Sequence, residues 1–231
     1  LLPAASLLAT ALLVAACAGQ DTTPSGVSTS AALGLPEALP PPGMDTVALA
    51  PADAFMAALA SHCGQAFAGK VRVDVPESPD NAFAGKPLVM HVRECREGEV
   101  RIPFHVGADR SRTWVITRTA TGLRLKHDHR HEDGSPDEST MYGGDTAQAG
   151  TAVRQAFPVD AESIALFGRL GMPASVTNTW AIEIVPGQQF VYELSRPGGR
   201  LFQVEFDLTR PVPLHPGHVH SRSQQDATEL V

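Results

Sequence analysis

The chain has 231 residues, of which 43% are hydrophobic and 19% charged, and its formal net charge at pH 7 is −7. This mildly acidic balance, without any basic cluster, excludes a nucleic-acid-binding protein, because neutralisation of phosphates by Lys and Arg dominates the affinity of that class. The first 16 residues carry no charge, so the whole net charge belongs to the part of the chain that follows them.

Residues 1–16, LLPAASLLATALLVAA, are apolar and rich in alanine. The run is shorter than the about 20 strongly apolar residues that a membrane-spanning helix needs. Its length and its ending in small residues predict a signal peptide that is removed from the mature protein.

The residues Val14-Ala15-Ala16-Cys17 resemble the lipobox of bacterial lipoproteins. This resemblance implies cleavage before Cys17 and acylation of that cysteine, which anchors the protein in a membrane of the cell envelope. Ala18, rather than an aspartate, follows the cysteine, and by the sorting rule of these lipoproteins this implies the outer membrane, with the protein facing the periplasm. The positive residues that usually precede the apolar run are missing. An ordinary cleaved signal peptide is therefore the alternative interpretation.

Residues 18–51 contain six prolines and four glycines but neither Lys nor Arg. A segment of this composition buries too little apolar surface to fold, and together with the lipidated cysteine it predicts a flexible tether over residues 17–51. Residues 211–231 are polar and lack periodicity, which predicts a disordered tail. Between these two segments, residues 52–210 are expected to form a single domain.

The domain opens with a helical pattern, in which Phe55, Leu59 and Cys63 recur every four residues between residue 52 and about residue 67. If Cys17 is acylated, Cys63 and Cys95 form an even pair in an oxidising compartment. We therefore expect a disulfide between them, which would stabilise the domain by roughly 3–4 kcal/mol. Two buried free thiols are the alternative.

From residue 69 onward, apolar residues alternate with polar ones, which is typical of strands with one buried face. A second helix interrupts the strands, with Asp160 as its N-cap and Gly171 at its end. Short turns join the strands, and such turns favour antiparallel neighbours. Strands are expected at residues 70–75, 87–94, 100–106, 112–119, 122–131, 138–142, 151–157, 179–185, 189–196 and 200–208, and the helix at 160–170.

These elements predict a mainly β domain, an antiparallel up-and-down β-barrel of about eight to ten strands with one N-terminal helix and one inserted helix. A β-sandwich is the alternative. The anchored barrel with its opening helix resembles lipocalin-like proteins, some of which are bacterial outer-membrane lipoproteins that bind apolar ligands. The resemblance covers residues 70–208 and is architectural only, because the Gly-x-Trp that lipocalins carry near the first strand is missing. It therefore implies no ligand class.

The most informative stretch begins at Leu123 and ends in a series of histidines. If Leu123 and Leu125 point into the barrel, strand alternation places three histidines on the same inward face: His127, His129 and His131. The charged residues between them are expected in water: Arg124, Lys126, Asp128 and Arg130.

Same-face neighbours on a strand lie roughly 7 Å apart, so His129 can share a metal ion with either His127 or His131. A third ligand from a neighbouring strand would complete a zinc site with an open position, which suits hydrolytic chemistry. The candidates for this third ligand are His91, His105, Glu138 and Tyr142. Alternatively, His127, His129, His131 and Tyr142 line a polar mouth and contact a ligand, or the histidines are structural.

Three functions stay open, and no complete catalytic constellation selects among them. The first is a non-catalytic barrel that binds a small, partly apolar ligand. The second is an assembly or interaction module that binds another envelope protein through its outer face and has a packed interior. The third is a metal-binding protein or a zinc-type hydrolytic enzyme that uses His127 and His129. These functions differ in whether the barrel is hollow and whether the histidines reach into it.

Overall fold

The computed structural model describes residues 49–78 and 81–213. The predicted signal peptide, the lipobox with Cys17 and most of the predicted tether lie outside this part of the chain, as does the predicted tail from residue 214 onward. None of the helices in the described ranges is long and apolar enough to cross a membrane.

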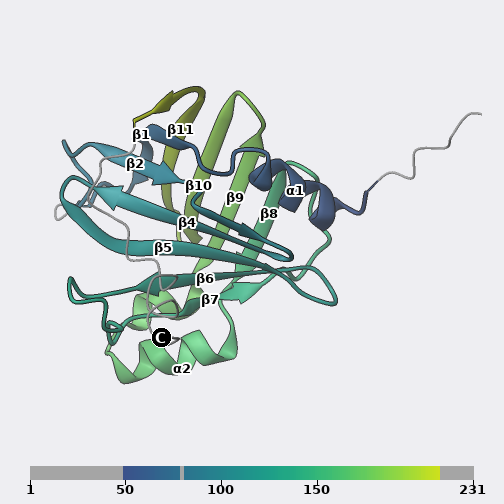
Figure 1. Cartoon of the computed structure of the whole chain (residues 1–231). Coiled ribbons are helices and arrows are strands. Elements are labelled where there is room, and N and C mark those ends of the chain that lie inside the picture. Colours follow the sequence, from purple (N-terminus) through teal and green to yellow (C-terminus); the bar gives the residue numbers. More distant parts are fainter. Residues whose placement is uncertain (1–48, 79–80, 214–231) are drawn as a thin grey trace, which may run out of the picture. The chain divides into compact units, whose positions relative to one another are not determined.

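An antiparallel sheet forms the body of the domain and curls into a nearly closed barrel (Figure 1). Ten strands follow one another in the order β7-β6-β5-β4-β2-β1-β11-β10-β9-β8, and β3 pairs with β4. The predicted antiparallel barrel with one N-terminal and one inserted helix is therefore confirmed. The strands are β1 (Ala66–Val75), β2 (Leu88–His91), β3 (Glu94–Arg96), β4 (Glu99–Val106), β5 (Asp109–Arg118), β6 (Leu123–His129), β7 (Tyr142–Asp145), β8 (Arg154–Pro158), β9 (Thr179–Val185), β10 (Gln189–Arg196) and β11 (Arg200–Val212).

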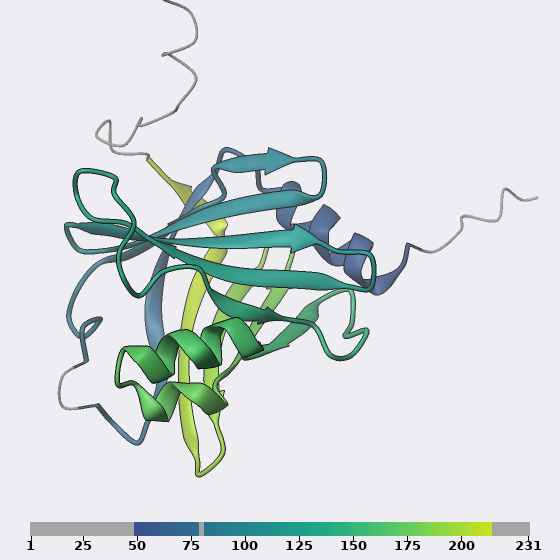
Figure 2. The ribbon, with the colours of Figure 1, turned by 90° about the horizontal axis from the view of Figure 1, so that it is seen from below.

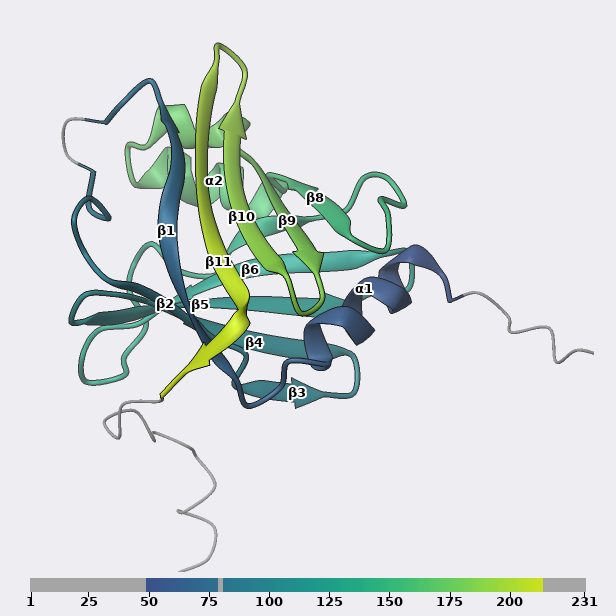
Figure 3. The same cartoon turned by 90° about the horizontal axis from the view of Figure 1, so that it is seen from above.

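The helix α1 (Pro51–Ala60) lies across one end of the barrel, against β4, β5, β8 and β9 (Figure 3). Its inward face buries Phe55 and Leu59 completely, because these side chains are four residues apart and so share one stripe of the helix. On its other side, Asp53 accepts a hydrogen bond from Arg118 of β5 at 2.6 Å. This end of the barrel is therefore closed.

The predicted disulfide between Cys63 and Cys95 is confirmed, and it joins the turn after α1 to β3. The helix itself ends at Ala60, earlier than the sequence pattern predicted. Gly64 has φ +81°, a conformation that glycine adopts without strain, and it turns the chain into β1. Apolar spacing alone did not reveal this turn.

The interior of the barrel is filled by side chains from the inward faces of the strands. In β11, Phe202, Val204, Phe206 and Leu208 are buried while the residues between them are partly exposed, as the alternation predicted. Aromatic rings from several strands stack on one another; the centroids of Trp114 and Tyr192, for example, are 4.6 Å apart. Side chains from the strands thus form one hydrophobic core inside the barrel.

The barrel closes at a seam between β7 and β8, the two ends of the sheet. Beside the seam, α2 (Ala161–Arg169) packs on β7, and the short 3-10 helix η1 (Pro173–Thr177) lies next to α2 (Figure 2). Asp160 caps α2, as predicted, by accepting a hydrogen bond from the Ser163 N–H at 2.8 Å. The N–H of Asp160 in turn donates to the carbonyl of Gly143 in β7 at 2.9 Å.

Two glycines and a serine hold the seam together. The Ser163 hydroxyl accepts from the Gly143 N–H at 2.8 Å and donates to the Gly143 carbonyl at 3.1 Å. A Cβ atom on Gly144 would lie only 1.8 Å from the carbonyl oxygen of Pro158 in β8. The close approach of β7 to β8 therefore requires glycine at this position.

Candidate functional site

The strand β6 carries the predicted histidines from the interior of the barrel to its open end. Its first residue, Leu123, pairs with Arg118, which binds α1, whereas His129 at its other end pairs with Arg112. We call this second end, formed by Arg112 and His129 together with Tyr142 of β7, the mouth. The mouth lies at the end of the barrel opposite α1.

The structure separates the three predicted histidines. His127 is 3% exposed and lies inside the barrel, and His129 is half-buried at the mouth. His131 comes after the end of β6; it is exposed, and its ring nitrogen lies 3.9 Å from a carboxylate oxygen of Asp137. Alternation predicted the positions of the first two correctly, but the regular strand stops before the third.

The outward residues of β6 are not all in water, contrary to the sequence expectation. Lys126 and Asp128 are 8% and 7% exposed. The ammonium group of Lys126 donates to the carboxylate of Asp160 at 2.6 Å, because the start of α2 covers this part of the outer face. Asp128 accepts from Arg130 at 2.7 Å and lies 3.7 Å from Arg101. Both buried charges are thus paired, as burial requires.

The imidazole of His127 is fully engaged in hydrogen bonds. The carbonyl of Tyr142, 3.1 Å from Nδ1, can only accept, so Nδ1 carries the proton. Nε2 therefore accepts from the hydroxyl of Tyr192, which lies 2.8 Å away. Burial lowers the pKa of His127 to about 3, so the ring is neutral at physiological pH.

Tyr142 connects His127 to His129. Its ring stacks on His127 with centroids 4.6 Å apart, and its hydroxyl lies 3.3 Å from Nε2 of His129. Burial raises the pKa of Tyr142 to about 12, and burial together with the positive charge of Arg112 lowers the pKa of His129. All three rings are therefore uncharged at neutral pH, which leaves Arg112 as the charged group of the mouth.

A small cavity of about 70 Å³ lies among these side chains. Its wall includes His127, His129 and Tyr142, three of the four residues predicted to contact a ligand. It also includes residues that the sequence analysis did not select: Phe83, Phe104, Arg112, Thr113, Trp114 and Tyr192. Arg112 is the only Lys or Arg in this wall.

Sequence patterns contained a signal for some of the missed residues. Arg112 and Trp114 lie directly opposite His129 and His127 in the β5–β6 ladder, so a correct pairing of the two predicted strands would have found them. Tyr192 lies on the inward face of β10, where Phe190 is also buried. Phe83, by contrast, comes from a connection without periodicity, and no pattern marked it.

The geometry does not support the predicted zinc site. A metal ion at His127 would have to displace the hydrogen bond from Tyr192, because Nε2 has only one lone pair. Of the candidate third ligands, Tyr142 alone reaches the cavity, whereas His91, His105 and Glu138 are absent from its wall. No group of three or more His, Cys, Asp or Glu suited to a metal ion occurs in the described ranges.

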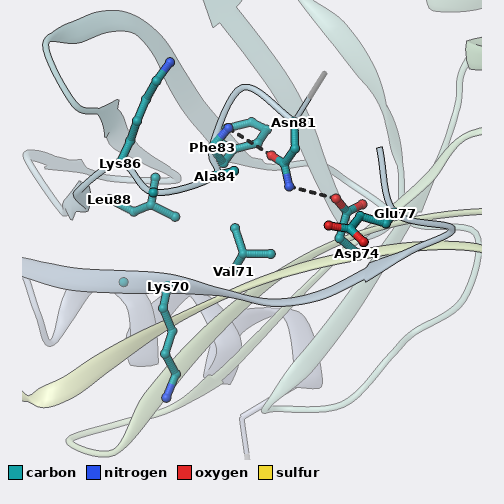
Figure 4. A pocket seen from close by; sticks show the side chains of 11 residues that line it. Lys70, Val71, Asp74, Glu77, Asn81, Phe83, Ala84, Lys86 and Leu88 are labelled. Atoms are coloured by element: carbon teal, nitrogen blue, oxygen red, sulfur yellow. Dashed lines mark hydrogen bonds between the residues drawn. The ribbon is translucent and has the colours of Figure 1, made fainter. Parts of the chain in front are cut away.

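A larger groove of about 540 Å³ lies next to the mouth, between β1 and the segment that leads into β2 (Figure 4). β2 pairs only with residues 66–69 of β1, so the two strands diverge beyond Gly69. Figure 4 shows Val71 and Leu88 pointing into the groove and Lys70 pointing away from it. A hydrogen bond of 2.7 Å from Asn81 to Asp74 crosses the groove at one end.

Comparisons of the chain with protein-family models, with curated proteins and with solved structures found no match. The chemistry of the mouth is therefore the basis for a functional assignment.

Proposed function

We propose that the protein is a non-catalytic, small-ligand-binding barrel of the cell envelope that binds its ligand at the mouth. The observation that carries this proposal is the cavity where Arg112, His129 and Tyr142 meet an aromatic floor. Small-molecule sites typically combine apolar walls with a few convergent polar groups, and groups with perturbed pKa values gather at such sites. The cavity at the mouth has aromatic walls and a few polar groups. Burial also lowers the pKa of His127 and His129 and raises that of Tyr142.

The packed interior limits what the ligand can be. It excludes a long apolar ligand buried along the barrel axis, because the space that such a ligand would fill is occupied by core side chains. The ligand, or the part of it that enters the protein, must be small and must bind near the surface. This sharpens the sequence-based hypothesis of a partly apolar ligand held at a histidine-lined mouth.

Nuclear magnetic resonance of the isotope-labelled protein tests the proposal, with a library of small aromatic, aliphatic, cationic and anionic fragments as probes. Bound fragments should shift the indole N–H signal of Trp114, which lines the cavity, more than that of Trp180, which does not. The variant His129→Leu should lose these shifts, while His131→Leu should keep them because His131 lies outside the cavity. If no fragment binds with a dissociation constant below about 1 mM, the proposal fails.

The lipobox resemblance supports a second proposal, which concerns the position of the protein in the cell. We propose that the barrel is attached to the outer membrane through acylated Cys17 and faces the periplasm. The variant Cys17→Ser should then move from the membrane fraction to the soluble fraction of lysed cells. Retention of this variant in the membrane fraction would contradict the proposal.

A second candidate is an envelope assembly or interaction module, which the packed interior favours. In this case the outer face of the barrel binds another envelope protein, and the mouth cavity has no ligand of its own. Crosslinking in intact cells should then trap one dominant partner, and substitutions of His129 or Tyr142 should leave its yield unchanged. Loss of the crosslink in those variants would instead connect the partner to the mouth.

A further inference from the structure

Phe83 separates the mouth cavity from the open groove beside it. Its side chain belongs to the wall of both spaces. The cavity alone, at about 70 Å³, is small, whereas the groove is about 540 Å³. The groove alone has the usual size of a small-molecule pocket, about 300–1,000 Å³, whereas the cavity beside Arg112 is far below it. The position of the Phe83 side chain therefore decides whether a ligand in the groove can also reach the cavity beside Arg112.

The ring of Phe83 lies in a slot that suits any aromatic ring. It stacks on Phe104 with centroids 5.8 Å apart and an interplanar angle of 14°, and it lies 5.0 Å from the ring of Phe202. The guanidinium carbon of Arg112 lies 5.8 Å from the centroid of the same ring. Aromatic pairs and cation–π contacts at these distances are favourable for rings in general, whether they belong to a phenylalanine or to a ligand.

The segment that delivers Phe83 has few other contacts with the barrel. The residues on either side of it, Ala82 and Ala84, are exposed, and so are the three residues that follow. Asn81 supports the segment by accepting from the Phe83 N–H at 2.9 Å and donating to Asp74 at 2.7 Å. Phe83 itself is only half-buried. Withdrawal of its ring therefore exposes less apolar surface than withdrawal of a core phenylalanine would.

Arg112 defines the charge of the ligand. It donates to Asp109 through Nη1, and its side chain also lines the cavity. Although burial acts to raise it, hydrogen bonds from Ser111 and Arg112 lower the pKa of Asp109 to about 2, so this carboxylate stays ionised. A second carboxylate on the free side of the guanidinium is a common arrangement, because Arg presents five donors in a planar fork.

We propose that the ligand of this barrel is a small aromatic carboxylate whose ring takes the place of Phe83 between Phe104 and Phe202 and whose acid group enters the cavity beside Arg112. This inference rests on the proposed ligand-binding function. Phe83 then acts as an internal competitor: the unliganded mouth is filled by the protein's own ring, and the ligand must displace it. The affinity of the protein is reduced by the fraction of time that Phe83 occupies the slot.

Isothermal titration calorimetry with three probes tests the inference on the full chain. The probes are 3-phenylpropanoate, which has a ring and an acid, 3-phenylpropanol, which has the ring alone, and hexanoate, which has the acid alone. We expect 3-phenylpropanoate to bind the wild type most tightly. The variant Phe83→Ala should bind it about tenfold more tightly, because the competing ring is gone. Phe83→Leu, which keeps an apolar contact but not the ring, should fall between the two.

Charge is tested by a matched pair of variants, each made in the Phe83→Ala background. Arg112→Gln should remove the preference for 3-phenylpropanoate over 3-phenylpropanol. Lys86→Gln should keep that preference, because Lys86 lines the groove but not the cavity, although it loses the same positive charge. If Lys86→Gln has the larger effect, the acid group lies in the groove and the assignment to Arg112 is wrong.

The ligand-binding function and the displacement of Phe83 are contradicted by different results. If library fragments shift Trp114 but neither Phe83→Ala nor Phe83→Leu binds any of the three probes more tightly than the wild type, the displacement of Phe83 is overturned and the proposed function stands. If no fragment and no probe binds any variant, both proposals fail. Urea unfolding of each variant confirms that a lost signal is not a lost fold.

Discussion

The seam and the mouth share the strand β7, yet they differ in how their polar groups are satisfied. At the seam, Gly143 and Ser163 exchange two hydrogen bonds, and Lys126 binds Asp160. The backbones also approach closely there, since a Cβ on Gly144 would lie 1.8 Å from the carbonyl oxygen of Pro158. At the mouth, Arg112 and Tyr142 border a cavity, and the hydroxyl of Tyr142 lies a long 3.3 Å from its partner His129.

If the mouth binds a ligand as proposed, stability and binding depend on different parts of the barrel. Closely packed polar groups that satisfy one another hold the fold, and their removal leaves buried atoms without partners. Polar groups around a cavity contribute less to the fold and are available to a ligand. Substitutions at the seam should therefore change the free energy of unfolding, and substitutions at the mouth should change affinity.

The largest effect is expected for Gly144→Ala at the seam. The new methyl group would overlap the carbonyl of Pro158 at 1.8 Å, and backbone cannot move aside as a flexible side chain can. We expect a loss of about 3–5 kcal/mol in the free energy of unfolding, measured by urea denaturation.

The matched control is Gly168→Ala in α2, where no atom lies within 4 Å of the added Cβ. It should stabilise the protein by roughly 0.5–1 kcal/mol, because alanine favours helices. Equal effects of the two substitutions would show that the seam is not tightly packed.

The second effect is acid destabilisation through His127, which lies where seam and mouth meet. Its pKa is about 3 in the fold, below the ordinary 6.5, so the folded protein resists its protonation and the unfolded chain does not. Stability is therefore complete above pH 6.5 and falls as the pH decreases from 6.5 towards 3. The loss attributable to this residue should be on the order of 4 kcal/mol at pH 3.

Urea unfolding between pH 7 and pH 4 measures this dependence. The variant His127→Gln keeps a donor and an acceptor but cannot titrate, so its stability should fall less steeply with decreasing pH than that of the wild type. The comparison uses slopes, because the substitution also changes the stability at neutral pH. Parallel slopes would mean that other groups cause the acid sensitivity, among them His129 and His91, whose pKa values are also lowered.

Most of the barrel could be predicted from the sequence because strand alternation and turn residues are local signals. The bounds predicted for β9 and β10 agree with the structure to the residue, and Asp160 caps α2 as expected. Glycine disfavours strands locally, and where a strand nevertheless contains glycine, a tertiary contact explains it. Residues 142–145 form β7 despite two glycines, because the close approach of neighbouring strands requires them.

The site could be predicted only in part. Alternation placed His127 inside the barrel, but it could not show that Tyr192, 65 residues away, would occupy its second nitrogen and so disfavour a metal. Nor could it show that α2 would cover Lys126. Phe83 lay beyond sequence reasoning altogether, because its role depends on two spaces that exist only in the folded barrel.

The smallest effect on stability is expected for Tyr142→Phe at the mouth, and it is the most direct test of the contrast with the seam. The substitution removes one long hydrogen bond beside a cavity that water can enter, so the free energy of unfolding should change by less than about 0.5 kcal/mol. Ser163→Ala removes a hydroxyl that makes two hydrogen bonds, of 2.8 and 3.1 Å, in a buried place, and it should cost about 2 kcal/mol. Each change deletes a single hydroxyl oxygen. Urea unfolding of the two variants therefore compares the stability that a hydroxyl contributes at the mouth with the stability that one contributes at the seam. If Tyr142→Phe costs as much as Ser163→Ala, the mouth is packed like the seam, and its polar groups serve the fold instead of a ligand.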